Sequence, residues 1–147
     1  RPQPKAGPAP SININKPQSF VLKNGLKVLV VENHKLPRVS FNLTLDNPPY
    51  AEGTKKGVSD LLSSMIGNGT QSVSKNAFNE EIDFLGANIN FWDSGASANG
   101  LSRYSKRILE LMSDGALNPL FVQEEFEKEK EKLIEDVSGK YIEIYKK

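Results

Sequence analysis

The sequence contains no cysteine and a single histidine, His34, and these two shortages exclude several kinds of site. Without cysteine there is no disulfide, no thiolate metal site and no cysteine nucleophile. His34 lies in the polar segment Glu32-Asn33-His34-Lys35, where a solvated loop side chain is a better interpretation than a general base. Any site in this chain must therefore work without a cluster of imidazoles.

Neither an excess of charge nor a long apolar run is present. The formal net charge is +1 and the basic residues are scattered, so we expect no nucleic acid partner. No apolar run approaches the roughly 20 residues needed to cross a bilayer, so we expect no membrane insertion by this chain. The 147 residues are 37% hydrophobic and 25% charged, which is typical of one globular domain or a large part of one.

Proline is concentrated at the start of the chain. Residues 1–17 are rich in proline and have almost no large apolar side chains, which predicts an extended tether before a folded domain over residues 18–147. The first residue is Arg1 rather than Met, as after removal of a targeting segment or a cut. We therefore expect an exported protein of the bacterial periplasm or cell envelope, with the mitochondrial matrix as the alternative compartment.

Alternating and turn-bounded apolar runs predict strands. Asn24-Gly25 is typical of a hairpin turn, because both positions accept a positive φ at low cost. Asp93-Ser94-Gly95 indicates the turn of a second hairpin that joins the same sheet. The strands predicted in this way cover residues 20–22, 26–31, 39–45, 87–92 and 97–102.

Apolar residues at helical spacing predict four helices, over residues 57–66, 74–85, 104–117 and 123–137. The side chains expected to face the core are Val58, Leu61, Leu62, Met65, Ile66, Ala77, Phe78, Ile82, Leu85, Ile108, Leu109, Leu111, Met112, Leu117, Phe126, Leu133 and Val137. Strands followed by helices mixed with a hairpin predict an α+β fold. In this fold an antiparallel-rich mixed sheet is covered by helices on one face.

Five short segments occur in an order that resembles the pitrilysin and insulinase superfamily, which includes mitochondrial processing peptidase. The resemblance extends from Ser19 to Val137. The segments are Phe20-x-Leu22-x-Asn24-Gly25-Leu26-x-Val28, Gly57 to Met65 with Gly69-Thr70, Phe84-Leu85-Gly86-Ala87, Asn118-Pro119, and Phe126-Glu127-Lys128-Glu129-Lys130. The family's lobes are longer than this chain, so the resemblance implies the N-terminal part, roughly two-thirds, of one lobe.

The resemblance also places the family's catalytic positions. In its His-x-x-Glu-His pattern the two histidines share one helical face and bind zinc, and the glutamate activates water. Here the histidine positions hold Asp60 and Ser64, and the base position holds Ser63. The third-ligand position holds Asp136, which is one methylene shorter than the family's glutamate. The acidic residue that the family has seven positions earlier is present as Glu129. The resemblance therefore implies no zinc, no other cofactor and no catalysis.

One alternative for these positions stays open on residue chemistry. Asp60, Ser63, Ser64 and Asp136 offer oxygen donors, which suit calcium or magnesium better than zinc. The simpler interpretation is that they are polar positions on the outer face of an amphipathic helix and its neighbour. A separate expectation concerns Phe91 and Trp92, which are adjacent in a strand and so point to opposite faces.

Family members that lack the catalytic pattern are non-catalytic partners, so the resemblance implies an inactive subunit or lobe that pairs with an active counterpart and helps to enclose or bind extended peptide. The family's substrates add a strand to the sheet edge near the active site. The residues at that edge in this chain are Ile89, Asn90, Phe91, Trp92 and Asp93. The alternative is a non-enzymatic scaffold subunit of a larger cell-envelope complex.

Overall fold

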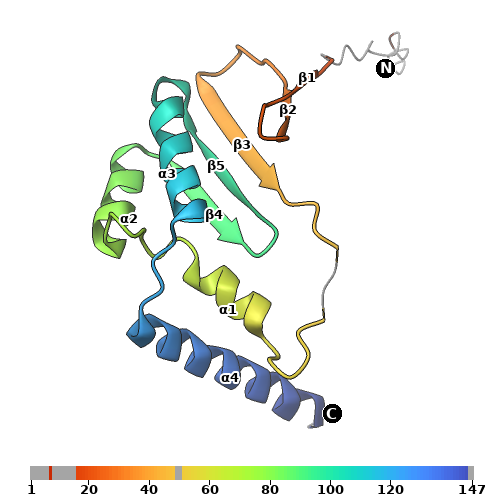
Figure 1. Ribbon diagram of the computed structural model, residues 1–147, viewed down its shortest axis with the longest axis vertical. Helices are drawn as coiled ribbons and strands as arrows, with labels where there is room; N and C mark the ends of the chain where they lie inside the picture. Colours follow the sequence, from red (N-terminus) through yellow and green to blue (C-terminus); the bar gives the residue numbers. More distant parts are fainter. Residues whose placement is uncertain (1–6, 8–15, 49–50, 146–147) are drawn as a thin grey trace, which may run out of the picture. The chain divides into compact units, whose positions relative to one another are not determined.

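The computed structural model describes residues 7, 16–48 and 51–145, with side-chain burial as far as residue 139 (Figure 1). The predicted tether therefore lies almost entirely outside the described residues. Two compact units are present, Arg1–Leu36 and Pro37–Lys147. None of the described helices is both long enough and apolar enough to cross a membrane.

The first unit contains the predicted hairpin. Strand β1 (Gln18–Val21) pairs antiparallel with β2 (Lys27–Val30). The N–H of Gly25 donates to the carbonyl of Leu22 at 2.9 Å, and Gly25 alone in this turn has a positive φ, of 88°. The hairpin is thus confirmed, but the turn is longer than the two-residue form that the Asn-Gly pair suggests, because Asn24 stays at negative φ.

The second unit contains a three-stranded antiparallel sheet in the order β3-β5-β4. Its strands are β3 (Arg38–Thr44), β4 (Asn88–Trp92) and β5 (Gly95–Leu101). The predicted strands and the α+β class are confirmed, but the described strands form two sheets where the sequence suggested one. Alternation predicts which face of a strand is buried, and it does not specify the neighbouring strand.

The four helices match the predicted positions and are α1 (Val58–Met65), α2 (Lys75–Phe84), α3 (Ser105–Leu117) and α4 (Gln123–Tyr145). A short 3₁₀ turn, Ser102–Tyr104, precedes α3. Ser74 caps α2, because its Oγ accepts from the N–H of Ala77 at 3.4 Å. Helix α4 continues past the expected end at Val137 to Tyr145. A single helical glycine, here Gly139, costs only about 1 kcal/mol and does not stop a helix.

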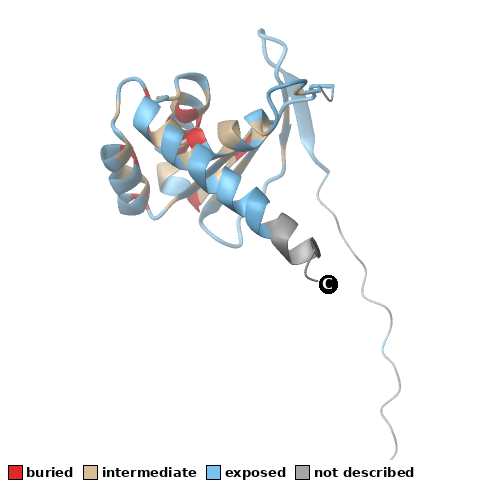
Figure 2. Cartoon of the chain, turned by 90° about the horizontal axis from the view of Figure 1, so that it is seen from below, coloured by how far each residue is buried: buried red, intermediate tan, exposed pale blue. Residues whose placement is uncertain are grey.

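The core lies between one sheet face and helices α2 and α3 (Figure 1). Its buried centre contains Phe78, Leu85, Ala96, Ala98, Ile108, Leu111 and Met112. Five side chains that were predicted to face the core are instead exposed: Val58, Ala77, Leu109, Leu117 and Val137. Only one stripe of each helix meets the sheet, so residues at its margin reach solvent. Most of α4 is likewise exposed (Figure 2).

Candidate functional site

The site begins with the N-terminus of α1, which a glutamate from the preceding loop holds in place. The Glu52 carboxylate accepts from the N–H of Gly57 and from the N–H of Ser59, each at 2.8 Å. These bonds, that from Ser59 first, lower the pKa of Glu52. Gly57 has a φ of 85°, and a Cβ there would lie 2.9 Å from Cδ2 of Leu133 in α4. Glycine thus allows α4 to approach the start of α1 closely.

A buried threonine joins the end of α1 to the segment before α4. Thr70 is 1% exposed, and its Oγ1 accepts from the N–H groups of Ser72 and Val73 at 3.3 and 3.1 Å. Its backbone forms a β-bridge with Pro119, and the N–H of Leu120 donates to the carbonyl of Gly69 at 3.3 Å. The Gly69-Thr70 and Asn118-Pro119 segments, noted separately in the sequence, therefore contact each other.

This junction places α4 beside α1 (Figure 1). An ion pair between Lys75 Nζ at the start of α2 and Glu125 Oε2 in α4, 2.8 Å long, connects the start of α4 with α2. The pKa of Glu125 is lowered by Lys75 first and by Lys128 second. Helices α1 and α4 therefore face each other, and residues from both helices line two hollows.

The smaller hollow, of about 160 Å³, is lined by most of the positions to which the resemblance gives catalytic roles in the family. Asp60 and Ser64 reach it from α1, and Glu129 and Asp136 reach it from α4. The remaining lining residues are Leu61, Lys132 and Leu133. The structure therefore brings together four of the five positions that the resemblance identified, although they lie up to 76 residues apart by number (136 minus 60).

Ser63, at the base position, does not line this hollow. Its Oγ accepts a hydrogen bond of 3.0 Å from the backbone N–H of Asp93, just beyond the end of β4. Ser64 Oγ donates to the carbonyl of Leu61 within α1, at 3.0 Å. The two serines thus make structural hydrogen bonds, one between elements and one inside the helix.

The charges in the small hollow do not suit a zinc ion. Lys132 Nζ lies 2.6 Å from Glu129 Oε1, and this carboxylate raises the pKa of Lys132. The Lys132 ammonium group is therefore already paired with Glu129. Among the carboxylates that line the hollow, that of Glu129 is the one that is largely buried, since its side chain is 19% exposed. The other donors are the carboxylates of Asp60 and Asp136 and a serine hydroxyl, whereas zinc prefers imidazole and thiolate. Within the described residues, no group of three or more His, Asp and Glu side chains has a metal-binding arrangement.

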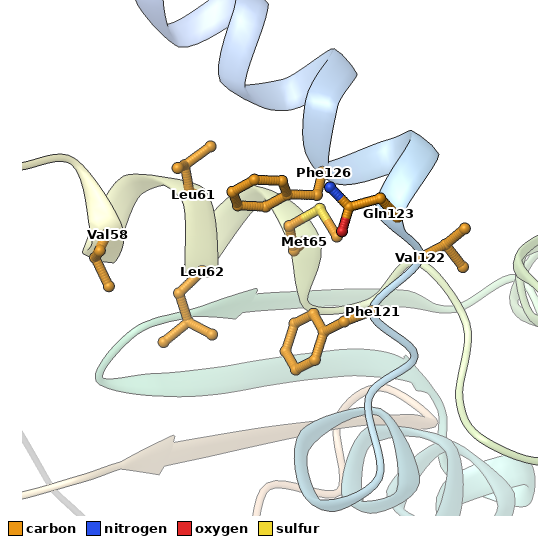
Figure 3. A pocket seen from close by; sticks show the side chains of 8 residues that line it. All are labelled: Val58, Leu61, Leu62, Met65, Phe121, Val122, Gln123 and Phe126. Carbon is orange, nitrogen blue, oxygen red and sulfur yellow. The ribbon is translucent and has the colours of Figure 1, made fainter. Parts of the chain in front are cut away.

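The larger hollow is an apolar groove of about 420 Å³ between α1 and the start of α4 (Figure 3). Figure 3 shows the Phe126 ring reaching from α4 toward Leu61 and Met65 of α1. The full lining is Val58, Leu61, Leu62, Met65, Phe121, Val122, Gln123 and Phe126. The sequence interpretation placed the α1 residues in the core and missed the groove, although the apolar pair Phe121-Val122 just after Pro119 was a signal for it. Val58, Phe121 and Val122 are exposed.

The predicted peptide-binding edge falls on β4, which lies at one side of the three-stranded sheet. Ile89 and Phe91 pack against the core, as expected for alternate residues of one strand. Trp92 instead lies next to Gly95 of β5, where a Cβ would be 3.2 Å from the indole. Asn90 is exposed, and Asp93 follows the end of the strand. Binding of a peptide at this edge stays a prediction.

Comparison with known proteins decides the family. The sequence model described as "Insulinase (Peptidase family M16)" matches residues 27–141. The chain belongs to the insulinase family of peptidases. It is 28% identical over 133 residues to an "Uncharacterized zinc protease" of Rickettsia felis, a match that covers 87% of the chain and 31% of the relative.

Two solved structures have the same fold. One, from Pseudomonas fluorescens, is described as a peptidase M16 inactive domain; it has a TM-score of 0.66 and 25% identity, over 79% of this chain and 30% of that one. A protease from Helicobacter pylori has a TM-score of 0.70 and 20% identity, over 84% of this chain and 31% of that one. The chain thus spans about a third of the length of each of these three proteins.

Proposed function

We propose that this chain is part of a catalytically inactive subunit or lobe of an insulinase-family protease, and that it pairs with an active counterpart and helps to hold extended peptide. The observation that carries the proposal is the hydrogen bond of the Ser63 side chain. At the position where the family resemblance expects the general base, this side chain accepts a hydrogen bond from Asp93 and supports the end of β4. A hydroxyl in that role is a poor base near neutral pH.

The donor set of the small hollow supports the same proposal. Asp60, Ser64 and Asp136 provide only oxygen atoms, and Lys132 brings a positive charge next to Glu129. The Pseudomonas fluorescens structure, which is described as an inactive domain, has a closely similar fold. Both observations favour a member in which the fold is kept and the zinc chemistry is absent.

The proposed contribution to peptide binding uses the edge of β4. Backbone groups on the outer side of an edge strand are available to pair with another extended chain. In this proposal the segment from Ile89 to Asp93 receives the peptide, the partner is a zinc-bearing subunit or second lobe, and the complex is located in the periplasm or cell envelope.

The proposal is tested on the full-length protein that carries this chain. We expect less than stoichiometric zinc by elemental analysis and no hydrolysis of a quenched fluorescent peptide by the protein alone. Addition of a counterpart that carries His-x-x-Glu-His is expected to restore hydrolysis. Stoichiometric zinc or turnover in the isolated protein would refute the proposal.

Affinity purification separates this role from the alternative, a scaffold subunit of a larger envelope complex. Recovery with a His-x-x-Glu-His subunit is expected if the chain belongs to a protease. Recovery only with proteins that are not proteases, and no binding of peptide by the recovered complex, would favour the scaffold.

A further inference from the structure

Three asparagines of this chain are followed directly by glycine: Asn24, Asn68 and Asn99. This dipeptide is chemically labile, because glycine has no Cβ to shield its backbone nitrogen from the side-chain amide of the asparagine before it. Reaction requires that the glycine nitrogen loses its proton and reaches Cγ of the asparagine. The surroundings of each pair in the folded chain therefore decide which pair reacts.

The fold restrains the pair Asn99-Gly100. It lies in β5, the central strand of its sheet, where Asn99 is paired with both Ser40 and Asn88. Gly100 is buried, and a Cβ there would lie 2.6 Å from Cδ1 of Ile108. Rotation of this backbone requires that the strand leaves the sheet, so the pair is protected.

The Asn68-Gly69 pair is restrained at the junction that follows α1. Asn68 Nδ2 donates to the carbonyl of Ser64 at 3.0 Å, which ties the side-chain amide to the end of the helix. Gly69 is buried, and a Cβ there would lie 2.7 Å from the Lys75 nitrogen. Because Gly69 is buried among backbone atoms, hydroxide has little access to its nitrogen and its main chain has little room to rotate.

Asn24-Gly25 is the pair at the surface. It forms the tip of the hairpin of β1 and β2, and both residues are exposed, as are Leu22, Lys23 and Leu26 around them. Its restraint is local, because the N–H of Gly25 donates to the carbonyl of Leu22 at 2.9 Å within the turn. Opening of an exposed hairpin tip costs little free energy, so this bond breaks readily. The Gly25 nitrogen is then accessible to hydroxide.

The side chain of Asn24 is already folded toward the atom that attacks it. Its Oδ1 accepts from the N–H of Leu26 at 3.2 Å, which makes an Asx-turn, in which the side chain folds back over the following peptide group. The same N–H stabilises the negative charge that develops on Oδ1 during attack at Cγ, as in an oxyanion hole. Lys23 and Lys27 flank the turn, and their positive charge favours the deprotonated form of a nearby nitrogen.

We propose that Asn24 is a site of spontaneous modification, at which the hairpin turn converts the asparagine to isoaspartate and aspartate. Hydroxide removes the proton of the Gly25 nitrogen, this nitrogen forms a bond to Cγ of Asn24, and Nδ2 takes up a proton from water and leaves as ammonia. Water then hydrolyses the succinimide ring. Opening at the original main-chain carbonyl gives isoaspartate, and opening at Cγ gives aspartate. Overall, one water is consumed and one ammonia is released.

Isoaspartate at this position does not fit the hairpin turn. It routes the main chain through Cβ and Cγ, which adds one methylene group between Leu22 and Leu26. The N–H of Leu22 donates to the carbonyl of Leu26 at 2.9 Å, and this bond depends on the original spacing. A two-stranded hairpin is marginally stable by itself, so loss of the turn is expected to loosen β1 and β2. This modification does not depend on the proposed function.

The test ages the full-length protein at mildly alkaline pH and follows the three pairs by peptide mapping with mass spectrometry. Replacement of an amide by a carboxylate raises the mass of the peptide, and methylation by an isoaspartyl methyltransferase identifies isoaspartate. We expect Asn24 to convert about tenfold faster than Asn68 or Asn99, because its turn opens without the loss of sheet pairing or buried contacts. Asn68 and Asn99 are internal controls, since each also precedes glycine.

Two further measurements separate the effect of the fold from that of the sequence. In guanidinium chloride the three pairs are expected to react at similar rates, because each then lies in an unfolded chain. Hydrogen exchange in β1 and β2 is expected to be faster in aged than in fresh wild type. Asn24→Gln is the matched control, because attack on its more distant carbonyl is much slower, and its exchange is expected to stay the same on ageing.

The outcomes that would overturn the proposal are distinct. Absence of conversion at Asn24, or conversion of Asn68 or Asn99 at an equal or higher rate in the folded protein, would overturn it. The same preference for Asn24 in guanidinium chloride would also overturn it, because the neighbouring sequence and not the turn would then select the site. Equal hydrogen exchange in aged and fresh wild type would overturn the effect on β1 and β2.

Discussion

The backbone N–H of Asp93 donates a hydrogen bond of 3.0 Å to Oγ of Ser63, and this bond connects α1 with the end of β4. In an active relative, the same helix position is the one that the family pattern gives to the base. In this chain the serine side chain at that position is directed at the sheet and makes a contact between two elements.

Loss of this contact is expected to cost stability. Ser63→Ala removes the acceptor, which costs about 1 kcal/mol, while the gain in helix propensity is at most ~0.5 kcal/mol. Ser64→Ala gains the same propensity and loses only a hydrogen bond within the helix. We expect urea denaturation to find Ser63→Ala about 1 kcal/mol less stable than Ser64→Ala. Equal stability of the two variants would mean that the Asp93 contact contributes nothing.

The Glu52 cap of α1 predicts a dependence of stability on pH. Its pKa is lowered in the folded state by the N–H groups of Ser59 and Gly57, so the carboxylate stabilises the fold above its unfolded pKa, which is about 4.5. This contribution is lost as the pH falls below that value through the folded pKa. The melting temperature of Glu52→Gln is expected to fall less steeply than that of the wild type between about pH 5 and pH 3, the range in which glutamate side chains usually titrate.

The control for the cap is Glu80→Gln, on the exposed surface of α2. This variant removes one carboxylate of the same type, and the shape of its curve of melting temperature against pH should follow the wild type. A Glu52→Gln curve parallel to that of Glu80→Gln would show that the cap is not coupled to folding.

The junction between Gly69-Thr70 and Asn118-Pro119 depends on glycine. Gly69 has a φ of 96°, and a Cβ there would lie 2.7 Å from the Lys75 nitrogen and 2.8 Å from the Val73 oxygen. Gly86 also has a positive φ, 57°, but a Cβ there would meet no atom within 4 Å. Gly86→Ala should cost about 1 kcal/mol for conformation alone, and Gly69→Ala should cost roughly 2 kcal/mol more because backbone must also move. Chemical denaturation of both variants measures the difference, and equal costs would contradict the steric argument.

Local features of the fold were predictable from the sequence, whereas the long-range pairings were not. The turn at Gly25, the start of α2 near Ser74 and the alternation in β3 depend on a few neighbouring residues, and each occurs where it was predicted. The bridge between Thr70 and Pro119 joins residues with no shared local pattern. Periodicity also cannot distinguish a helix face that meets the core from one that lines an open groove, as at Val58.

The family pattern selected positions that lie close together in the structure, and it did not indicate their contacts. The family pattern was sufficient to select Asp60, Ser64 and Asp136, which do line one hollow. It gave no indication of Lys132, because an ion pair between residues i and i+3 of a charge-rich helix looks like an ordinary solvated surface pair. It also missed the role of Ser63, because the partner of that side chain is a backbone N–H, which every strand end offers.

The arrangement of α1 and α4 predicts that a zinc site can be rebuilt with two substitutions. Asp60→His and Ser64→His together place two imidazoles at i and i+4, opposite the carboxylates of Asp136 and Glu129. We expect the melting temperature of this variant to rise when zinc is added, because a ligand that binds only the folded state stabilises it. The wild type is expected to show no such rise, since its hollow offers hydroxyl and carboxylate donors beside an ammonium group.

The matched control for the rebuilt site is Asn79→His combined with Asp83→His, the same spacing on the exposed surface of α2. This pair has imidazoles but no opposing helix with carboxylates, so its zinc-dependent rise should be smaller than that of the Asp60 and Ser64 variant. Adding Lys132→Met to the rebuilt site should enlarge the rise further, because Glu129 then loses its internal cation. Equal zinc responses of the α1 and α2 histidine pairs would mean that α4 does not supply ligands, and that the small hollow is not the counterpart of the family's metal site.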